Sequence, residues 1–353
     1  MGHTYRAVGW NRQKRRYDLA LILGIAAYLG AFVGLGASLT PAATAETLLI
    51  RGLGSAALTL LHVILCIGPL ARLDTRFLPL LYNRRHLGVA MFLLAFGHGA
   101  FALIQFHALG DVNPLVSLLS NHADWGNVAQ FPFELLGAGA LAILFLMAAT
   151  SHDFWLANLS APVWKTLHMG VYTAYALLIG HVFLGTFQIE GSPWVRGLLG
   201  LGVVAVAGLH ASAWWVGRGR EAELHGRAGS PADDGFVRVA RLDELPDDRP
   251  FAVTLSGERV AVCRTDAGVT AVSGICQHQN GPLTEGRLRN GCLVCPWHGY
   301  EYRPEDGCSP EPFTERIPTF RVRVRSGQVW VHPQPSPAGT PQAPAPLDGE
   351  GAA

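Results

Sequence analysis

The chain has 353 residues, half of them hydrophobic and only 15% charged, with a formal net charge of +1. Together with a positive mean hydropathy, this composition argues against an ordinary soluble domain and places much of the chain in lipid. The near-neutral charge and the lack of a long basic tract with interleaved aromatic residues argue against a nucleic-acid partner.

Six apolar stretches are long enough to cross a bilayer, allowing for tilt. They are Tyr17–Leu39, Leu53–Ala71, Leu87–Leu109, Phe133–Ala149, Val163–Leu184 and Val195–Val216. Their many glycine and alanine residues suit close helix packing in lipid. We interpret residues 1–16 as a basic N-terminus before a retained anchor helix, because no small-residue cleavage site ends a short apolar region.

The distribution of arginine and lysine predicts the orientation of these helices. Basic residues gather before the first stretch, between the second and third, and after the sixth. By the positive-inside rule, both termini and the C-terminal domain are cytoplasmic, in a bacterial-type inner (plasma) membrane.

The C-terminal third is polar and predicts a different architecture. Residues 217–235 are typical of a linker, and short alternating runs such as FAVTL, RVAVCR, VTAVSG and FRVRVR over 236–333 predict strands. The tail, 334–353, is rich in Pro, Ala and Gly and is predicted to be disordered. The predicted fold is an all-α six-helix membrane bundle over 17–216, followed by a small all-β domain.

The segment CQHQNGPLTEGRLRNGCLVCPWHGYEY contains Cys-x-His, sixteen further residues, and Cys-x-x-His. Such a pattern can hold a [2Fe–2S] cluster, with two thiolates on one iron and two imidazoles on the other. The candidate ligands are Cys276, His278, Cys295 and His298. Zinc bound by two cysteines and two histidines is the alternative, and the Pro-Trp-His-Gly-Tyr context with flanking strands favours iron. Cys292 is interpreted as a buried packing residue.

On these residues the domain resembles the Rieske ferredoxin family over nearly all of 236–333. High-potential Rieske proteins have a disulfide between the two cluster loops, where this chain has Gly281 and Trp297. They also have a serine where this chain has Tyr300, whereas their tyrosine two residues later is kept as Tyr302. Hydrogen bonds to the sulfurs help to set the potential, so the resemblance implies a lower-potential cluster, ferredoxin-like or oxygenase-like.

Histidines inside the apolar helices are the second unusual feature, because ionisable side chains in lipid are rare and usually functional. A bis-histidine b-type haem uses neutral imidazoles from two facing helices. At 1.5 Å per residue, His98 and His181 lie at similar depths and could share a haem. His86 and His168, near the cytoplasmic surface, could hold a second. The others, His62, His107 and His210, are interpreted as polar packing or proton or propionate contacts, and His122 and His152 as solvated loop residues.

The segments RRHLGVAMFLLAFGH and WKTLHMGVYTAYALLIGH resemble the ferric reductase-like transmembrane family, over about Arg51 to Gly185. The likeness is greatest to the haem-binding membrane subunit of the bacterial periplasmic methionine sulfoxide reductase system. It implies haem ligands at His98, His168 and His181. His86 departs from that pattern, so its ligand role rests on depth alone, and the haem count of one or two stays open.

Together these features predict an oxidoreductase component that carries electrons across the membrane. A cytoplasmic ferredoxin or flavin reductase would reduce the cluster, and b-type haem would pass electrons to quinone, ferric iron or a periplasmic redox protein. The alternatives are quinol oxidation at the haem with electrons leaving through the cluster, or a non-catalytic redox sensor. A self-contained Rieske oxygenase is disfavoured, because the soluble region lacks a histidine pair with an acidic partner for mononuclear iron.

Overall fold

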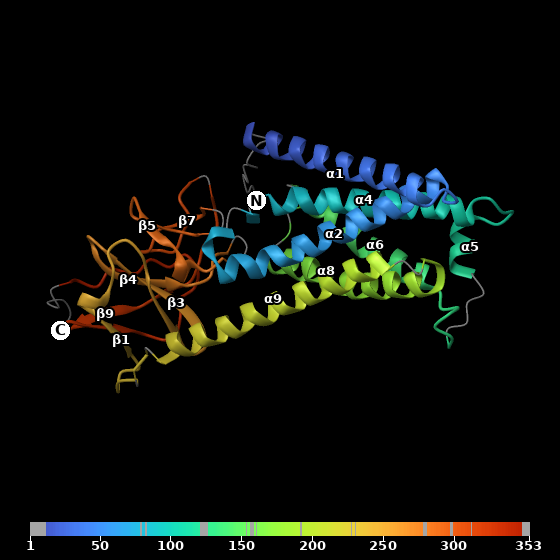
Figure 1. Ribbon diagram of the computed structural model, residues 1–353. Helices are drawn as coiled ribbons and strands as arrows, with labels where there is room; N and C mark the ends of the chain where they lie inside the picture. Colours follow the sequence, from blue (N-terminus) through green and yellow to red (C-terminus); the bar gives the residue numbers. More distant parts are fainter. Residues whose placement is uncertain are drawn as a thin grey trace. The chain divides into compact units, whose positions relative to one another are not determined.

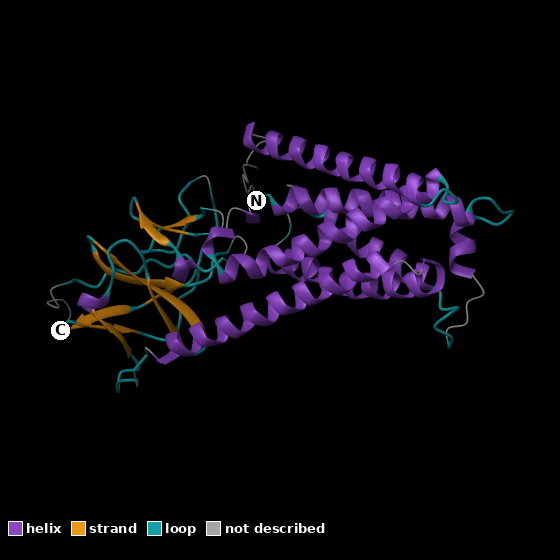
Figure 2. Ribbon diagram, viewed as in Figure 1, coloured by secondary structure: helices purple, strands orange, loops and turns teal. Residues whose placement is uncertain are grey.

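The computed structural model describes residues 12–77, 80–81, 83–120, 126–152, 154–155, 159, 161–190, 193–226, 228–229, 231–277, 281–296, 299–311 and 313–347. The chain divides into two compact units that meet in sequence between Ala213 and Trp214. The first is helical and the second is built mainly of strands (Figures 1 and 2).

The helical unit follows the predicted apolar stretches. Its helices are α1 (Arg12–Leu39), α2 (Ala45–Leu73), α4 (Arg84–His107), α5 (Pro114–Ser120), α6 (Phe133–Ala149), α8 (Ala161–Gly185) and α9 (Pro193–Gly226), with short turns at Thr75–Phe77 and Thr186–Glu190. Among the described residues, five helices are long and apolar enough to cross a membrane, and α6, with 17 residues, is a shorter apolar helix. The short helix α5 was not predicted.

Large apolar side chains remain exposed on the outside of this unit. Leu23 on α1 is 60% exposed, and Leu201 and Val204 on α9 are 72% and 69% exposed. Exposing apolar surface to water costs roughly 25 cal/mol per Å², whereas the same surface is compatible with lipid chains. The chain is therefore a membrane protein.

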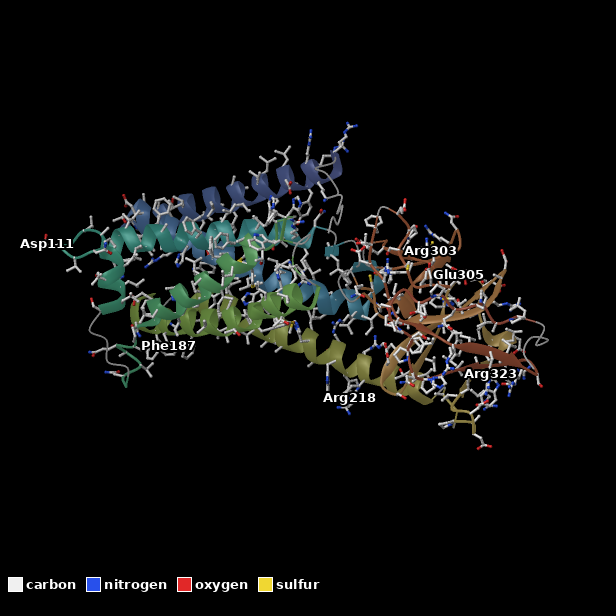
Figure 3. All side chains as sticks on the ribbon, turned by 180° about the vertical axis from the view of Figure 1, so that it is seen from behind. Asp111, Phe187, Arg218, Arg303, Glu305 and Arg323 are labelled. Carbon is white, nitrogen blue, oxygen red and sulfur yellow. The ribbon has the colours of Figure 1, made fainter. Side chains whose placement is uncertain are left out.

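The helices α4 and α8 run in the same direction. Figure 3 shows Asp111, which follows α4, and Phe187, which follows α8, at the same end of the helical unit. Residues that lie equally far along these two helices therefore share a depth, as the comparison of His98 with His181 requires.

The second unit is a set of small antiparallel sheets, as predicted. Its strands are β1 (Val237–Arg241), β2 (Phe251–Leu255), β3 (Glu258–Thr265), β4 (Gly268–Ser273), β5 (Arg287–Arg289), β6 (Cys292–Val294), β7 (Glu301–Tyr302), β8 (Thr319–Phe320), β9 (Val322–Arg325) and β10 (Gln328–Val331). They form the sheets β1-β10-β9, β2-β3-β4-β8 and β5-β6-β7. Alternating residues such as Val253, Val329 and Phe320 are fully buried between the larger sheets.

Asp234 links the approach to β1 with strand β9. The Arg323 guanidinium donates to its carboxylate at 2.6 Å and also lies over the Phe236 ring, 3.9 Å from the ring centre. This hydrogen bond, with the charges of Arg323 and Arg325, holds the pKa of the Asp234 carboxyl at about 2, below its ordinary 3.8. The contact stabilises the fold only while the carboxyl is ionised.

The depressed pKa predicts an acid sensitivity that Asp234→Asn removes. An unfolded carboxyl protonates near pH 3.8 and the folded one near pH 2, so the stabilisation is complete above about pH 4 and is lost as the pH falls toward 2. We expect the wild-type unfolding temperature to fall more steeply than that of the variant over this window. Calorimetry measures it, with Asp233→Asn as the control, and parallel curves for wild type and Asp234→Asn would contradict the prediction.

The described part of the predicted tail is not disordered. Ala345 exchanges two backbone hydrogen bonds of 2.8 Å with Val269 on β4, and Ser336 donates to the Thr319 carbonyl at 2.8 Å. Extended, proline-rich backbone can pair along a sheet edge, which a prediction from composition overlooks. Gly268 permits the approach, because a Cβ there would lie 2.3 Å from the Ala345 carbonyl oxygen. Residues 348–353 lie outside the described part.

The Gly268→Ala substitution is expected to destabilise the strand-rich unit by about 2 kcal/mol or more, because the new Cβ collides with backbone and Gly268 has a positive φ of 131°. Gly257→Ala is the matched control, since Gly257 also has a positive φ, 82°, but open space around it. The temperature at which the iron–sulfur EPR signal is lost measures the effect. Equal losses in the two variants would mean that contact with the tail contributes nothing.

The first residues of the predicted linker, 217–226, are helical in the structure. Helix α9 ends at Gly226, whereas the sequence placed the end of the last helix at Val216. The intervening residues include Arg, Glu, Ala and Leu, which favour helix although they are too polar for a membrane span.

Candidate metal centres

Two loops of the strand-rich unit are closed in the same way around the candidate cluster cysteines. The Cys276 amide donates to the Gly281 carbonyl at 2.9 Å, and the Cys295 amide donates to the Tyr300 carbonyl at 2.7 Å. Each bond spans five residues, so each loop begins with a cysteine and contains one predicted histidine. His278 and His298 themselves, with Trp297, lie outside the described residues.

The two cysteines belong to one buried cluster. Cys276 is 1% exposed and Cys295 is 2% exposed, and both pack with Leu283, Leu293 and Tyr302. Neither forms a disulfide. Two buried thiols at the start of two matching loops fit the thiolate half of a [2Fe–2S] site.

Two tyrosines on the second loop have different partners. The Tyr302 hydroxyl accepts from the Gln277 amide at 3.1 Å and lies 3.4 Å from Cys276 Sγ, and it would donate to that sulfur when Cys276 is a thiolate ligand. The Tyr300 hydroxyl instead donates to Glu315 Oε1 at 3.0 Å. Burial, together with the charge of Cys276, raises the pKa of Tyr302, which keeps its proton available for donation.

Replacing Tyr302 with phenylalanine is expected to lower the cluster potential by tens of millivolts. A donor to a ligand sulfur stabilises the more negative, reduced state, and about 1 kcal/mol corresponds to roughly 40 mV for one electron. Tyr300→Phe is the control, because its hydroxyl is bound to Glu315, and it should leave the potential nearly unchanged. EPR-monitored titration measures both, and a larger shift in Tyr300→Phe would contradict this assignment.

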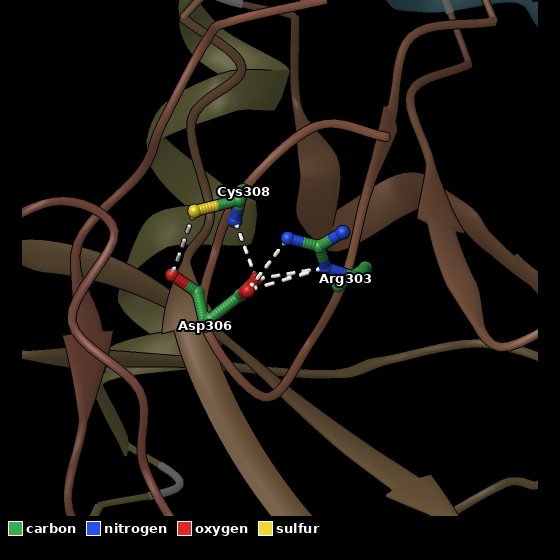
Figure 4. A network of polar contacts seen from close by, with 3 residues as sticks. All are labelled: Arg303, Asp306 and Cys308. Carbon is green, nitrogen blue, oxygen red and sulfur yellow. Dashed lines mark hydrogen bonds and ion pairs between the residues drawn. The ribbon is translucent and has the colours of Figure 1, made fainter. Parts of the chain in front are cut away.

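A third loop follows Tyr302 and is fixed by its own polar contacts (Figure 4). The Arg303 guanidinium donates to Asp306 at 2.7 Å, and the same carboxylate accepts from the Cys308 amide at 2.8 Å. The Gly307 amide closes the turn by donating to the Arg303 carbonyl at 2.8 Å. This network holds the chain that leads from Tyr302 toward Glu315.

Two further cysteines are packing residues, as expected for Cys292. Burial, followed by the charge of Glu305, raises the pKa of the Cys263 thiol to about 12, and burial also raises the pKa of Cys292. Their burial and their place outside the two cluster loops fit a packing role.

In the helical unit, His98 on α4 and His181 on α8 face each other. Their ring centres are 6.1 Å apart and their planes meet at 79°. His98 Nδ1 lies 2.9 Å from the Ile50 carbonyl oxygen, and His181 Nδ1 lies 2.9 Å from that of Phe133. Donation to these carbonyls leaves the Nε2 atoms as acceptors, and within the described chain no residue forms a hydrogen bond to them.

This separation fits two imidazoles on one metal. A metal–imidazole bond is about 2 Å and a ring centre lies roughly 1 Å behind its nitrogen, so two opposed ligands have centres about 6 Å apart. A carbonyl acceptor on the other nitrogen is the usual outer partner of a ligating histidine. His98 and His181 could therefore hold the iron of a haem between them through their Nε2 atoms.

The members of the other predicted pair, His86 and His168, each have partners of their own. His86 Nδ1 lies 2.7 Å from Asp18 Oδ1 on α1, which the sequence reasoning did not identify. His168 stacks on Trp164 at 3.8 Å, with Nδ1 2.9 Å from the Trp164 carbonyl and Nε2 3.3 Å from Ser151 Oγ. A backbone carbonyl and a carboxylate are both usual outer partners of a ligating histidine, so the pairing of His86 with His168 stays a prediction.

The remaining histidines have individual settings. His62 is 6% exposed, neither ring nitrogen has a partner among the described residues, and its ring meets Tyr175 edge-on at 5.6 Å. His107 pairs with Ser117 at 3.0 Å, and His210 with the Val206 carbonyl at 2.9 Å. His152 is an exposed loop residue, and His122 lies outside the described chain.

Comparison with known families assigns a different family model to each of the two units. Residues 53–179 match the family model described as the ferric reductase like transmembrane component. Residues 235–321 match the model of the Rieske [2Fe-2S] domain.

Individual relatives match the strand-rich unit. The alkene monooxygenase system ferredoxin component of Xanthobacter autotrophicus is 28% identical, over 32% of this chain and 94% of that protein. Cholesterol 7-desaturase of Ciona intestinalis is 34% identical, over 25% of this chain and 19% of that protein. Among solved structures, the ferredoxin of carbazole 1,9a-dioxygenase from Nocardioides aromaticivorans is 28% identical, with 28% of this chain and 98% of that chain covered and a TM-score of 0.27. The match spans about a fifth to a quarter of the length of the cholesterol 7-desaturases.

Proposed function

The chain joins a ferric reductase-like transmembrane domain to a Rieske [2Fe–2S] domain, and from this electron-transfer pairing we propose a transmembrane path that runs from a cytoplasmic donor, through the cluster, to b-type haem. The cluster and the haem supply one-electron chemistry, and the protein supplies ligands, spacing and potential. The observation that carries the proposal is the facing pair His98 and His181, with both Nδ1 atoms engaged by backbone carbonyls.

His98 and His181 would hold the haem through Nε2. His168 is the candidate ligand of a second haem, supported by its hydrogen bond to the Trp164 carbonyl. His86 is the weaker candidate, because it departs from the pattern of the family and rests on depth alone; its contact with Asp18 is compatible with ligation through Nε2. The finer likeness to the membrane subunit of the periplasmic methionine sulfoxide reductase system is part of this proposal, since it supplies the expectation for His168.

Cys276 and Cys295 would bind one iron of the cluster, with His278 and His298 on the other. The donor set favours a lower potential than that of high-potential Rieske proteins, because the Tyr300 hydroxyl, at the position of their serine, is engaged by Glu315. The donation from Tyr302 to Cys276 is the contribution that remains. A cluster that is a good reductant suits the start of the path. We therefore favour electron flow from the cytoplasmic cluster to the haem over quinol oxidation.

The partners and the orientation follow from the sequence pattern. A ferredoxin or flavin reductase is the proposed donor, and the positive-inside distribution supports a Rieske domain on the same, cytoplasmic side of a bacterial-type inner membrane. Quinone, ferric iron or a periplasmic redox protein is the proposed acceptor. Similarity to the ferredoxin component of a monooxygenase system is consistent with a redox-protein partner.

Anaerobic titration of the purified protein, followed by optical and EPR spectroscopy, tests the proposal. We expect b-type haem and a Rieske signal in the same protein, with the cluster potential below or near that of the haem. A cluster far above the haem would instead favour the reverse path, from quinol to a cytoplasmic acceptor. Protein without haem would overturn the electron path and favour a redox-sensing role.

A further inference from the structure

The two helix pairs that carry His98 and His181 repeat one another in sequence. Five residues of α2 are identical to the residues of α6 that lie 83 positions later in the chain. Three residues of α4 are identical to the residues of α8 at the same spacing. The matches are Leu53, Gly54, Ala57, Leu58 and Leu61 with Leu136, Gly137, Ala140, Leu141 and Leu144, and Leu94, Gly97 and His98 with Leu177, Gly180 and His181. One spacing for all eight matches indicates a single helix-pair pattern built twice.

The contacts repeat at the same spacing. Each histidine pairs with a carbonyl 48 residues earlier, Ile50 for His98 and Phe133 for His181, both at 2.9 Å. Four residues after each carbonyl, on the same face of the helix, stands a glycine, Gly54 or Gly137. The imidazoles thus lie in two equivalent half-sites, one from α2 and α4 and the other from α6 and α8.

The glycine of each half-site lies directly against the imidazole. A Cβ on Gly54 would lie 2.9 Å from His98 Nδ1, and one on Gly137 would lie 2.8 Å from His181 Nδ1. These distances are shorter than a carbon and a nitrogen that are not bonded tolerate, so any larger residue would push the ring away from its carbonyl. The carbonyl and the glycine surface together restrict rotation of the ring.

We propose that Gly54 and Gly137 are positioning residues that fix the planes of the two ligand imidazoles nearly perpendicular to each other. This inference rests on the proposed haem ligation by His98 and His181. Outer contacts orient the ligands of a metal, and here the repeated half-sites set the 79° angle between the rings. Perpendicular imidazoles leave two d orbitals of ferric low-spin iron nearly equal in energy. The oxidised protein should then give a highly anisotropic EPR signal with a large maximal g value, unlike the rhombic signal of parallel imidazoles.

The test is low-temperature EPR of the oxidised, full-length protein and of Gly54→Ala and Gly137→Ala. We expect the maximal g value to be large in the wild type and to shift in both variants. Gly139→Ala is the matched control on α6, because a Cβ there meets only Leu177 at an ordinary 3.6 Å, and Gly88→Ala on α4 meets nothing within 4 Å. Both controls should keep the wild-type signal.

A rhombic wild-type signal would overturn the inference, and so would an unchanged signal in Gly54→Ala and Gly137→Ala. If these variants do not fold, the wild-type spectrum alone still decides whether the rings are perpendicular. Failure of the proposed function looks different, because haem would then be absent from the wild type or retained when both His98 and His181 are replaced.

Discussion

Alanine in place of His98 or His181 is expected to abolish the b-type haem absorbance of the reduced protein. Each substitution removes one of two opposed imidazoles whose ring centres are 6.1 Å apart. Loss of a residue that merely supports a ligand already costs about 10–100-fold in metal affinity, so loss of the ligand itself should cost more. Haem content per protein, measured by the pyridine haemochrome spectrum, should fall at least tenfold in each variant.

His107→Ala is the control from the same helix as His98. Its ring pairs with Ser117, and it should leave the haem spectrum unchanged. The Rieske EPR signal should also persist in all three variants and report the amount of intact protein. Normal haem spectra in both His98→Ala and His181→Ala would contradict the assignment of these two histidines as haem ligands.

His168→Ala extends the experiment to the number of haems. If His168 ligates a second haem, its loss should halve the haem content and leave the signal from the His98 and His181 pair unchanged. If the protein holds one haem, the content should stay the same, because His168 stacks on Trp164 and bonds Ser151 rather than facing His98.

The order of helices and strands could be predicted from the sequence because it depends on local composition. A run of apolar residues in the helical half becomes a helix wherever it is long enough, as α6 does over Phe133–Ala149. The ends are harder, since hydropathy marks where lipid contact stops and not where helical hydrogen bonding stops. Helix α9 accordingly continues to Gly226.

The candidate haem pair could be predicted only in part. Spacing along α4 and α8 predicted similar depths for His98 and His181, but depth does not fix the rotation of a helix. The same reasoning paired His86 with His168, whose hydrogen bonds go to Asp18 and the Trp164 carbonyl. The backbone acceptors Ile50 and Phe133 were missed, because every residue has a carbonyl. The 83-residue repeat was the sequence signal that could have identified them.

The surroundings of the cluster show a similar limit. The sequence shows that Tyr300 stands where high-potential Rieske proteins have a serine. It does not show that the Tyr300 hydroxyl donates to Glu315, because that contact depends on the loop that follows β7. The tail could not be read from composition either. Ala345 is buried only because Gly268 lets two backbones meet, and pairing between distant segments leaves no local pattern.

Replacing Cys276 or Cys295 with alanine is expected to remove the iron–sulfur cluster and leave the haem in place. Each variant loses a buried thiol at the start of a cluster loop, and a [2Fe–2S] site has no spare ligand. Iron in excess of haem, acid-labile sulfide and the Rieske EPR signal should all fall at least tenfold, since even lost supporting contacts cost about 10–100-fold. Stoichiometric zinc in the wild type, without sulfide, would instead support the zinc alternative.

The same variants test the path. With a cytoplasmic ferredoxin and its reductase as donor, haem reduction should be lost in Cys276→Ala and Cys295→Ala, whereas dithionite, which can reach haem directly, should still reduce it. Cys308→Ala is the control, because this half-buried thiol donates to the Asp306 carbonyl and lies outside both cluster loops. If the donor still reduces the haem in these variants, electrons bypass the Rieske domain. The domain would then sense redox state rather than transfer electrons to the haem.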